Sequence, residues 1–305
     1  MHIWEIVAVL VLAAVGAVVW MTAWHPLALL VRSSRRSLAR AGLKRRWVPS
    51  PAGRQLAFTG GSGPLLVLLH GAGDQAGTWA RVAPALLQRH TLIIPDLAGH
   101  GSSAPASGPI GGATILAGLE AVLDHLAGPA PATLVGNSMG AWMAMVLAQR
   151  HPGRFRMVVA VDGGPLKHAG AVTLRPADRE QARRTMAALR DDGAPGIPDL
   201  VLDDLVRQAR TGPLARLEAA GAALEATLLD EDQLRRLDLP VRLIWGASDR
   251  LLPLDYARRV AAALPDASLT LIDRCGHLPQ QEAPERFLAT LLGVLDPGTP
   301  PQEFK

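Results

Sequence analysis

Ser138 lies where its neighbours could make its hydroxyl a nucleophile. The stretch Thr133–Gly140 reads TLVGNSMG, so a short apolar run leads into a serine with a glycine two residues away on each side. In a tight strand-to-helix turn, Cβ atoms at those two positions would clash, and the turn leaves the serine hydroxyl exposed. A chain with this glycine content carries such a pattern by chance in roughly one case in ten. The pattern therefore needs a base and an acid elsewhere in the chain.

Asp249 and His277 have the residue types and positions that suit an acid and a base. Asp249 follows the apolar run Val241–Trp245, and His277 follows the run Ser268–Ile272. The carboxyl ends of parallel strands meet at one edge of a sheet, which is where ligands bind in open α/β sheets. We therefore expect both side chains to lie near Ser138, with His277 accepting its proton and Asp249 orienting His277.

The elements that must position these residues are predicted by apolar periodicity. Runs of apolar residues without alternation are typical of strands buried on both faces of a parallel sheet. Helical periodicity between the runs predicts an α/β fold with a doubly wound, mostly parallel sheet. The predicted strands are 54–59, 65–69, 91–94, 133–135, 157–161, 241–245 and 268–272, and the helices between them are 81–88, 116–126 and 255–263.

A helical insertion interrupts the alternation of strands and helices. Residues 165–238 contain no predicted strand, and helical stretches at 177–191, 200–211 and 213–229 are separated by glycine and proline turns. An insertion between two strands of one sheet predicts a cap over the strands' carboxyl ends. We interpret its arginines, such as Arg179 and Arg207, as a solvated face rather than an anion site.

Five motifs in this order resemble the α/β-hydrolase fold superfamily, in the helical-cap branch that includes esterases and lipases. The motifs are LLVLLHGAG, DLAGHGSS, LVGNSMG, LIWGASDRLLP and CGHLPQQEAPE. The resemblance covers roughly residues 54–295 and implies an α/β-hydrolase fold with a cap inserted after the sixth strand. One position departs from the family, because Ala141 stands where a further glycine often follows the serine turn. Alanine is small enough for the same close helix packing.

The resemblance also implies roles for individual residues. Ser138 would attack a carbonyl carbon and His277 would take and return the proton, while Asp249 stabilises the charged imidazole. The backbone N–H groups of Ala72 and Met139 would form the oxyanion hole. Asp162 is the fallback acid, since some related enzymes carry their acid after the preceding strand.

The N-terminal segment predicts a single-pass membrane anchor at residues 1–31. No charged residue occurs from Ile6 to Ala23, and about 20 apolar residues suffice to cross a bilayer. A cleaved signal peptide fits less well, because Glu5 precedes the apolar run and no basic residue does. Basic residues within 32–49 predict a juxtamembrane linker, and the positive-inside rule then places the catalytic domain in the cytoplasm. The remaining predicted boundaries are 50–164 and 239–296 for the core, 165–238 for the cap and 297–305 for a tail.

Composition narrows the remaining function classes. The formal net charge of +4 comes from the basic stretch near the N-terminus, so no nucleic-acid partner is predicted. Cys275 is the only cysteine, which excludes an intramolecular disulfide and a cysteine-based metal cluster. No His and carboxylate cluster shows metal spacing, and we expect neither metal nor cofactor. The composition leaves the oligomeric state open.

These observations favour a serine hydrolase that cleaves a small-molecule carboxylic ester, including esters of lipid type. The same three residues could hydrolyse a C–C, amide or lactone bond instead. A catalytically silent binding module on the same fold is the non-enzyme alternative. Serine as the nucleophile argues against haloalkane and epoxide chemistry, which requires a carboxylate.

Overall fold

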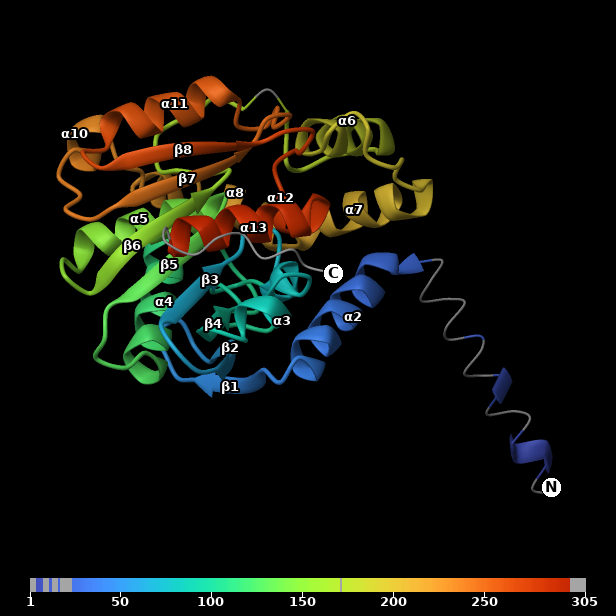
Figure 1. Ribbon diagram of the computed structural model, residues 1–305. Coiled ribbons are helices and arrows are strands. Elements are labelled where there is room, and N and C mark those ends of the chain that lie inside the picture. Colours follow the sequence, from blue (N-terminus) through green and yellow to red (C-terminus); the bar gives the residue numbers. More distant parts are fainter. Residues whose placement is uncertain (1–3, 8–10, 13–15, 17–23, 171, 297–305) are drawn as a thin grey trace.

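A computed structural model describes residues 4–7, 11–12, 16, 24–170 and 172–296 of the chain (Figure 1). Its centre is an eight-stranded sheet with the strand order β1-β2-β4-β3-β5-β6-β7-β8. β2 pairs antiparallel with β1 and with β4, whereas β3 to β8 run parallel. The strands are β1 (Lys44–Val48), β2 (Gln55–Gly61), β3 (Leu65–Leu69), β4 (Thr91–Pro95), β5 (Ala132–Asn137), β6 (Phe155–Val161), β7 (Val241–Gly246) and β8 (Ala267–Ile272).

Helices cover both faces of this sheet. One face packs against α4 (Gly112–Leu126), α5 (Met139–Arg150) and α11 (Leu254–Ala263). Apolar residues recur on one side of α4, as in Ile115, Leu119 and Val122, so that helix buries a single stripe. The other face packs against η1 (Ala76–Trp79), α3 (Ala83–Leu86) and α13 (Pro284–Leu295). The predicted α/β architecture with a mostly parallel sheet is thereby confirmed.

The insertion after β6 is helical, as predicted. It contains α6 (Arg179–Leu189), α7 (Asp199–Thr211), α8 (Pro213–Ala220), α9 (Ala222–Glu225) and α10 (Glu231–Leu234). Figure 1 shows α6 and α7 beyond the end of the sheet toward which β7 and β8 point. One predicted helix, 213–229, is instead divided at Gly221, whose φ of 43° breaks the helical path between α8 and α9.

The predicted membrane localisation is wrong, and the predicted anchor on which it depends is not supported. Within the described residues, no helix combines the length and the apolar character that a membrane span requires. The end of the expected span belongs to α2 (Pro26–Arg40), a helix that contains four arginines and packs against η1 and α7. The remainder of the expected anchor falls mostly at residues 1–3, 8–10, 13–15 and 17–23, which lie outside the described residues.

The predicted basic linker, residues 32–49, is also corrected. Its first part continues α2, and its second part forms the edge strand β1. Arg35 from this stretch bonds to Asp96, Gln75 and Ser102, so its charge serves an internal contact. The Asp96 side chain is fully buried, which explains why a cation is held there. The predicted tail, 297–305, lies outside the described residues.

Candidate active site

Ser138 occupies the turn between β5 and α5 in a conformation that few side chains adopt. Its φ is 55° and its ψ is −120°, and its backbone N–H donates to Val161 O at 2.9 Å. A Cβ atom at Gly140 would lie 2.7 Å from the carbonyl carbon of Leu69, so that glycine is required by close packing. The turn leaves Ser138 partly exposed, whereas its neighbours Asn137 and Met139 are buried.

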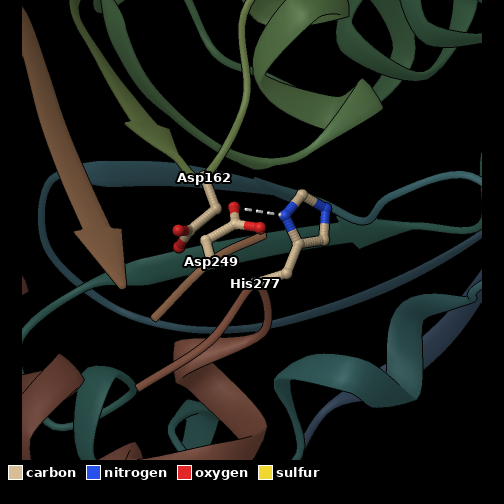
Figure 2. A group of neighbouring side chains, drawn as sticks. All are labelled: Asp162, Asp249 and His277. Atoms are coloured by element: carbon tan, nitrogen blue, oxygen red, sulfur yellow. Dashed lines mark hydrogen bonds and ion pairs between the residues drawn. The ribbon is translucent and has the colours of Figure 1, made fainter. Parts of the chain in front are cut away.

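His277 and Asp249 form a buried hydrogen-bonded pair (Figure 2). Nδ1 of His277 lies 2.7 Å from Oδ2 of Asp249. The other carboxylate oxygen, Oδ1, accepts backbone N–H groups from Leu251 at 2.8 Å and Leu252 at 3.1 Å. Three donors therefore stabilise Asp249 as an anion, and an anion at Nδ1 places the imidazole proton on that nitrogen.

This tautomer leaves Nε2 of His277 as the nitrogen that can accept a proton. His277 and Ser138 line the same cavity of about 310 Å³. In the part of the chain that the structure describes, neither Ser138 Oγ nor His277 Nε2 makes a hydrogen bond. Catalytic hydrogen bonds are often long in unliganded sites and shorten when substrate binds. The predicted nucleophile and base thus line one cavity, and the predicted acid is bonded to the buried side of the imidazole.

The two predicted oxyanion donors flank the same serine. Met139 is the first residue of α5, so its N–H lies at the positive end of the helix dipole. Ala72 follows β3 and lines the cavity with Ser138. The N–H groups of Ala72 and Met139 donate to no other described residue, and they remain available to a substrate oxygen.

His70 organises the loop that carries Ala72. Its Nδ1 lies 2.8 Å from Gly71 O, and its Nε2 accepts the Leu97 N–H at 2.9 Å. Burial lowers the pKa of His70 to about 4, so the ring is neutral at pH 7. His70 therefore serves as a structural hydrogen bonder in the loop after β3.

Asp162, the fallback acid, lacks the hydrogen bond to His277 that Asp249 makes in the described structure. Its Oδ1 accepts the Gly246 N–H at 2.8 Å, and burial raises its pKa well above the ordinary value. Oxygen or nitrogen atoms of Asp162, Asp249 and His277 lie within 4.8 Å of one another, which is a spacing that could hold a metal. A metal bound at Nδ1 would have to displace the His277–Asp249 hydrogen bond. The sequence prediction had not brought these three residues together as a cluster.

A second cavity meets the first at Ser138. It measures about 510 Å³ and is lined mainly by α8, α9 and the segment after β6. Its walls include the ion pairs Lys167–Glu225 and Arg175–Glu218. The smaller cavity is mainly apolar, with a lining from α6 and α7. Five residues line both cavities: Ala72, Ser138, Leu174, Leu214 and Leu251.

Leu174, Leu214 and Asp74 are site residues that the sequence did not single out. Leucines in a cap carry no signal of which way they face, because helical periodicity marks a buried stripe without naming its partner. Asp74 lines the smaller cavity, and burial raises its pKa to about 6. Its carboxylate accepts the Gln75 N–H at 2.8 Å and Gln281 Nε2 at 3.2 Å. The only sequence signal for Asp74 as a site residue was its position directly after the HGAG motif.

Comparison with known proteins finds a match over residues 66–290 to the family described as "Alpha/beta hydrolase family". A pimeloyl-[acyl-carrier protein] methyl ester esterase from Aromatoleum aromaticum is 36% identical, covering 73% of this chain and 94% of that relative. A 2-hydroxy-6-oxononadienedioate/2-hydroxy-6-oxononatrienedioate hydrolase from Cupriavidus pinatubonensis is 30% identical, covering 75% of this chain and 86% of that relative.

Solved structures show the same fold. The crystal structure of a membrane phospholipase A, described as a bacterial virulence factor, superposes with a TM-score of 0.77. The match covers 97% of this chain and 99% of the phospholipase chain, at 24% sequence identity. At this identity the likeness shows the fold alone and says nothing of substrate.

Proposed function

The chain belongs to the alpha/beta hydrolase family, and from that premise we propose that it cleaves carboxylic esters through an acyl-enzyme on Ser138. The observation that carries the proposal is the placement of Ser138 and His277 on one cavity, with Asp249 bonded to the far side of the imidazole. A serine, a base and an acid arranged in this order perform acyl transfer on unrelated folds. Geometry and family membership both support these residue roles.

Acylation would proceed by attack of Ser138 Oγ on the ester carbonyl carbon. Nε2 of His277 takes the hydroxyl proton, and Asp249 stabilises the imidazolium that forms. The carbonyl oxygen becomes an oxyanion, which the Ala72 and Met139 N–H groups stabilise. When the tetrahedral intermediate collapses, the C–O bond to the alcohol breaks and His277 returns the proton to the leaving oxygen. Water then repeats the sequence on the acyl-enzyme and releases the acid.

The cavities suggest where each half of an ester would bind. Walls such as Leu174, Met186 and Leu205 make the smaller cavity suitable for an apolar acyl chain. The larger cavity carries Lys167 and Arg175 at its walls, so a more polar alcohol group fits there. We therefore propose esters with an apolar acyl group as the substrate class. The esterase among the relatives acts on a methyl ester by its name, which supports ester chemistry for this family branch.

A panel of p-nitrophenyl esters of increasing acyl length tests the proposal. Wild-type protein is expected to release p-nitrophenol, and Ser138→Ala is expected to lose about 10⁴-fold or more in kcat. Ser62→Ala, which alters a serine in the turn before β3, serves as the matched control and should keep wild-type activity. Activity that survives Ser138→Ala would refute the mechanism, and so would a fluorophosphonate that labels Ser138→Ala as well as wild type.

Hydrolysis of a C–C bond is the second candidate. The relative from Cupriavidus pinatubonensis is named for dienoate substrates of this type, and the same three side chains could catalyse the reaction. A 2-hydroxy-6-oxo-dienoate added to wild-type protein distinguishes the candidates. Turnover of the dienoate with no turnover across the ester panel would replace the ester proposal by this one.

A further inference from the structure

Asp162 is buried at the end of β6, between the serine turn and the acid loop. Its backbone N–H donates to Ile244 O of β7 at 3.0 Å, while the preceding Val161 O accepts the Ser138 N–H. Its φ of 43° is in the left-handed region, which costs a non-glycine residue about 1 kcal/mol or more. Glycine would adopt this backbone without strain. A carboxyl side chain at a position that favours glycine requires an explanation.

The surroundings of Asp162 do not support a second anion. Its side chain is fully buried, and Oδ1 receives a single hydrogen bond, from Gly246 N–H. Oδ2 is buried without a hydrogen-bond partner among the described residues. An ionised carboxylate with one donor in such a place is strongly disfavoured. Asp249, by contrast, accepts two backbone N–H groups and the imidazole of His277.

Carboxylate oxygens of Asp162 and Asp249 lie within 4.8 Å of one another, and both side chains are buried. Two carboxylates repel at such a distance, and one proton shared between them converts the repulsion into a hydrogen bond. The proton belongs on the carboxyl with fewer donors, which is Asp162. Burial first, and then the charge of Asp249, raise the pKa of Asp162 well above its ordinary value.

We propose that Asp162 is a neutral carboxylic acid that donates a hydrogen bond to Asp249 and so acts as a positioning residue for the His277–Asp249 pair. The proposal rests on the ester hydrolase function proposed above. It gives the orphaned Oδ2 of Asp162 a proton and a partner. It also leaves Asp249 as the only anion bonded to the imidazole, held by a fourth donor in addition to the three already described.

The charge state of Asp162 matters because His277 must be neutral to act as a base. A second anion beside the imidazole would stabilise the imidazolium form, which cannot accept the Ser138 proton. The other titratable groups that face Asp162 are Glu282 on α12 (Pro279–Glu282) and Cys275. Glu282 accepts the N–H groups of Gly276 and Asp191, each at 2.8 Å. Burial raises the pKa of the Cys275 thiol to about 12, so it stays neutral.

Substitutions at Asp162 separate a neutral acid from an ionised one. Asn is neutral, nearly the same size, and keeps an N–H donor for Asp249 and a carbonyl acceptor for Gly246. Asp162→Asn is therefore expected to keep kcat/KM on p-nitrophenyl esters within about twofold, with an unchanged acidic limb of the pH profile. Asp162→Ala removes the donor, and a loss of about tenfold in kcat is expected with KM unchanged. Asp255→Asn, at an exposed acid on α11, is the matched control.

Three readouts make the proposal falsifiable. If Asp162 is an anion, Asp162→Asn removes a negative charge near His277 and moves the acidic limb to lower pH by about one unit, which would overturn the proposal. Wild-type kcat in Asp162→Ala would overturn it as well. Infrared difference spectra of wild type against Asp162→Asn are expected to show one protonated-carboxyl band, whose absence also contradicts the proposal. This spectrum needs no substrate, so it remains decisive even if Asp162→Ala fails to fold. Failure of the ester hydrolase function would appear separately, as a wild-type protein inactive on every ester.

Discussion

At the scale of single residues, the site is built on backbone conformations that most side chains avoid. Within the described ranges, the non-glycine residues with positive φ are Ser138, Asp162 and Arg274. They follow β5, β6 and β8, so each stands at the edge of the sheet where the cavities open. Residues held in such conformations cluster at functional sites because the surrounding fold determines them.

The sequence predicts some neighbours within the site and not others, for a physical reason. The glycines around Ser138 signal a tight turn, and the order of Ser138, Asp249 and His277 along the chain agrees with their meeting in space. No local pattern marks Asp162 as a neighbour of Asp249, because their proximity depends on how β6 and β7 pair. Register between strands is a tertiary property that neither strand encodes alone.

Asp249→Asn tests the role of the acid. The amide keeps the acceptor for Leu251 and Leu252 but is expected to donate to Nδ1 and hold His277 in the wrong tautomer. We expect kcat on p-nitrophenyl esters to fall by about 10³–10⁴-fold with an unchanged circular dichroism spectrum. A loss smaller than about tenfold would mean that Asp162 takes over as the acid. The double variant Asp162→Asn, Asp249→Asn would then be less active than Asp249→Asn alone.

His70 predicts a pH dependence of stability. Its pKa of about 4 in the folded protein lies below the ordinary 6.5, so the unfolded chain binds the proton more tightly. The titration of His70 therefore leaves the free energy of unfolding unchanged above pH 6.5. As the pH falls from 6.5 toward 4, this titration lowers the free energy of unfolding by roughly 3 kcal/mol in all. Asp74 acts in the opposite direction, because its pKa is raised to about 6 and the folded protein binds its proton more tightly.

The comparison of wild type with His70→Gln isolates this contribution. Gln can donate to Gly71 O and accept from Leu97 N–H without titrating. Urea denaturation at pH 4.5, 5.5 and 6.5 is expected to show a shallower loss of unfolding free energy in His70→Gln, by about 1 kcal/mol per pH unit. Parallel pH dependences in the two proteins would show that His70 is not the titrating group.

At the scale of elements, buried strands were predictable and edge elements were not. The run Leu65–Leu69 forms β3 with the predicted bounds, because a strand covered on both faces is apolar throughout. β1, with the sequence KRRWV, exposes four of its five residues and carries no such signal. In α2 an apolar start precedes an arginine-rich end, and the apolar start was interpreted as part of a membrane span.

Arg35→Ala tests whether α2 is an integral element of the domain. Arg35 bridges α2 to Asp96, whose side chain is fully buried and would lose its cation. We expect the free energy of unfolding to fall by about 2–4 kcal/mol in urea denaturation. Arg40→Ala removes an exposed arginine from the same helix and should change stability by less than about 0.5 kcal/mol. Equal effects of the two substitutions would contradict this role for Arg35.

At the scale of the whole molecule, hydrogen bonds join the cap to the loops that carry His277 and Asp249. The His277 N–H donates to Leu189 O at the end of α6 at 2.8 Å, and the Arg250 N–H donates to Ala188 O at 3.0 Å. Leu27 N–H in α2 donates to Asp204 in α7 at 3.0 Å, which joins the cap to a third part of the chain. The sequence predicted a cap, but these contacts could not be predicted from it, because they join segments with no shared pattern.

Gly276→Ala is expected to disturb the junction between cap and core. A Cβ at this position would lie 2.6 Å from Arg190 Cα, so the end of α6 must move away from His277. We expect kcat to fall by about tenfold or more and the unfolding free energy to fall by about 1–3 kcal/mol. Gly293→Ala in α13 is the matched control, since a Cβ there meets nothing within 4 Å. Helix propensity predicts a gain of about 0.5–1 kcal/mol for that control.

The position of Ser138 on a wall shared by two cavities has a consequence for the fate of the acyl group. In the proposed acyl-enzyme, the acyl chain occupies the smaller cavity and the departing alcohol leaves the larger one vacant. A short-chain alcohol supplied with water can enter that space and compete for the acyl group. The protein is then expected to form a new ester as well as free acid, in a ratio that rises linearly with alcohol concentration. Gas chromatography of both products measures that partition, and it would make this hydrolase a transacylase whenever the second cavity is filled by an acceptor better than water.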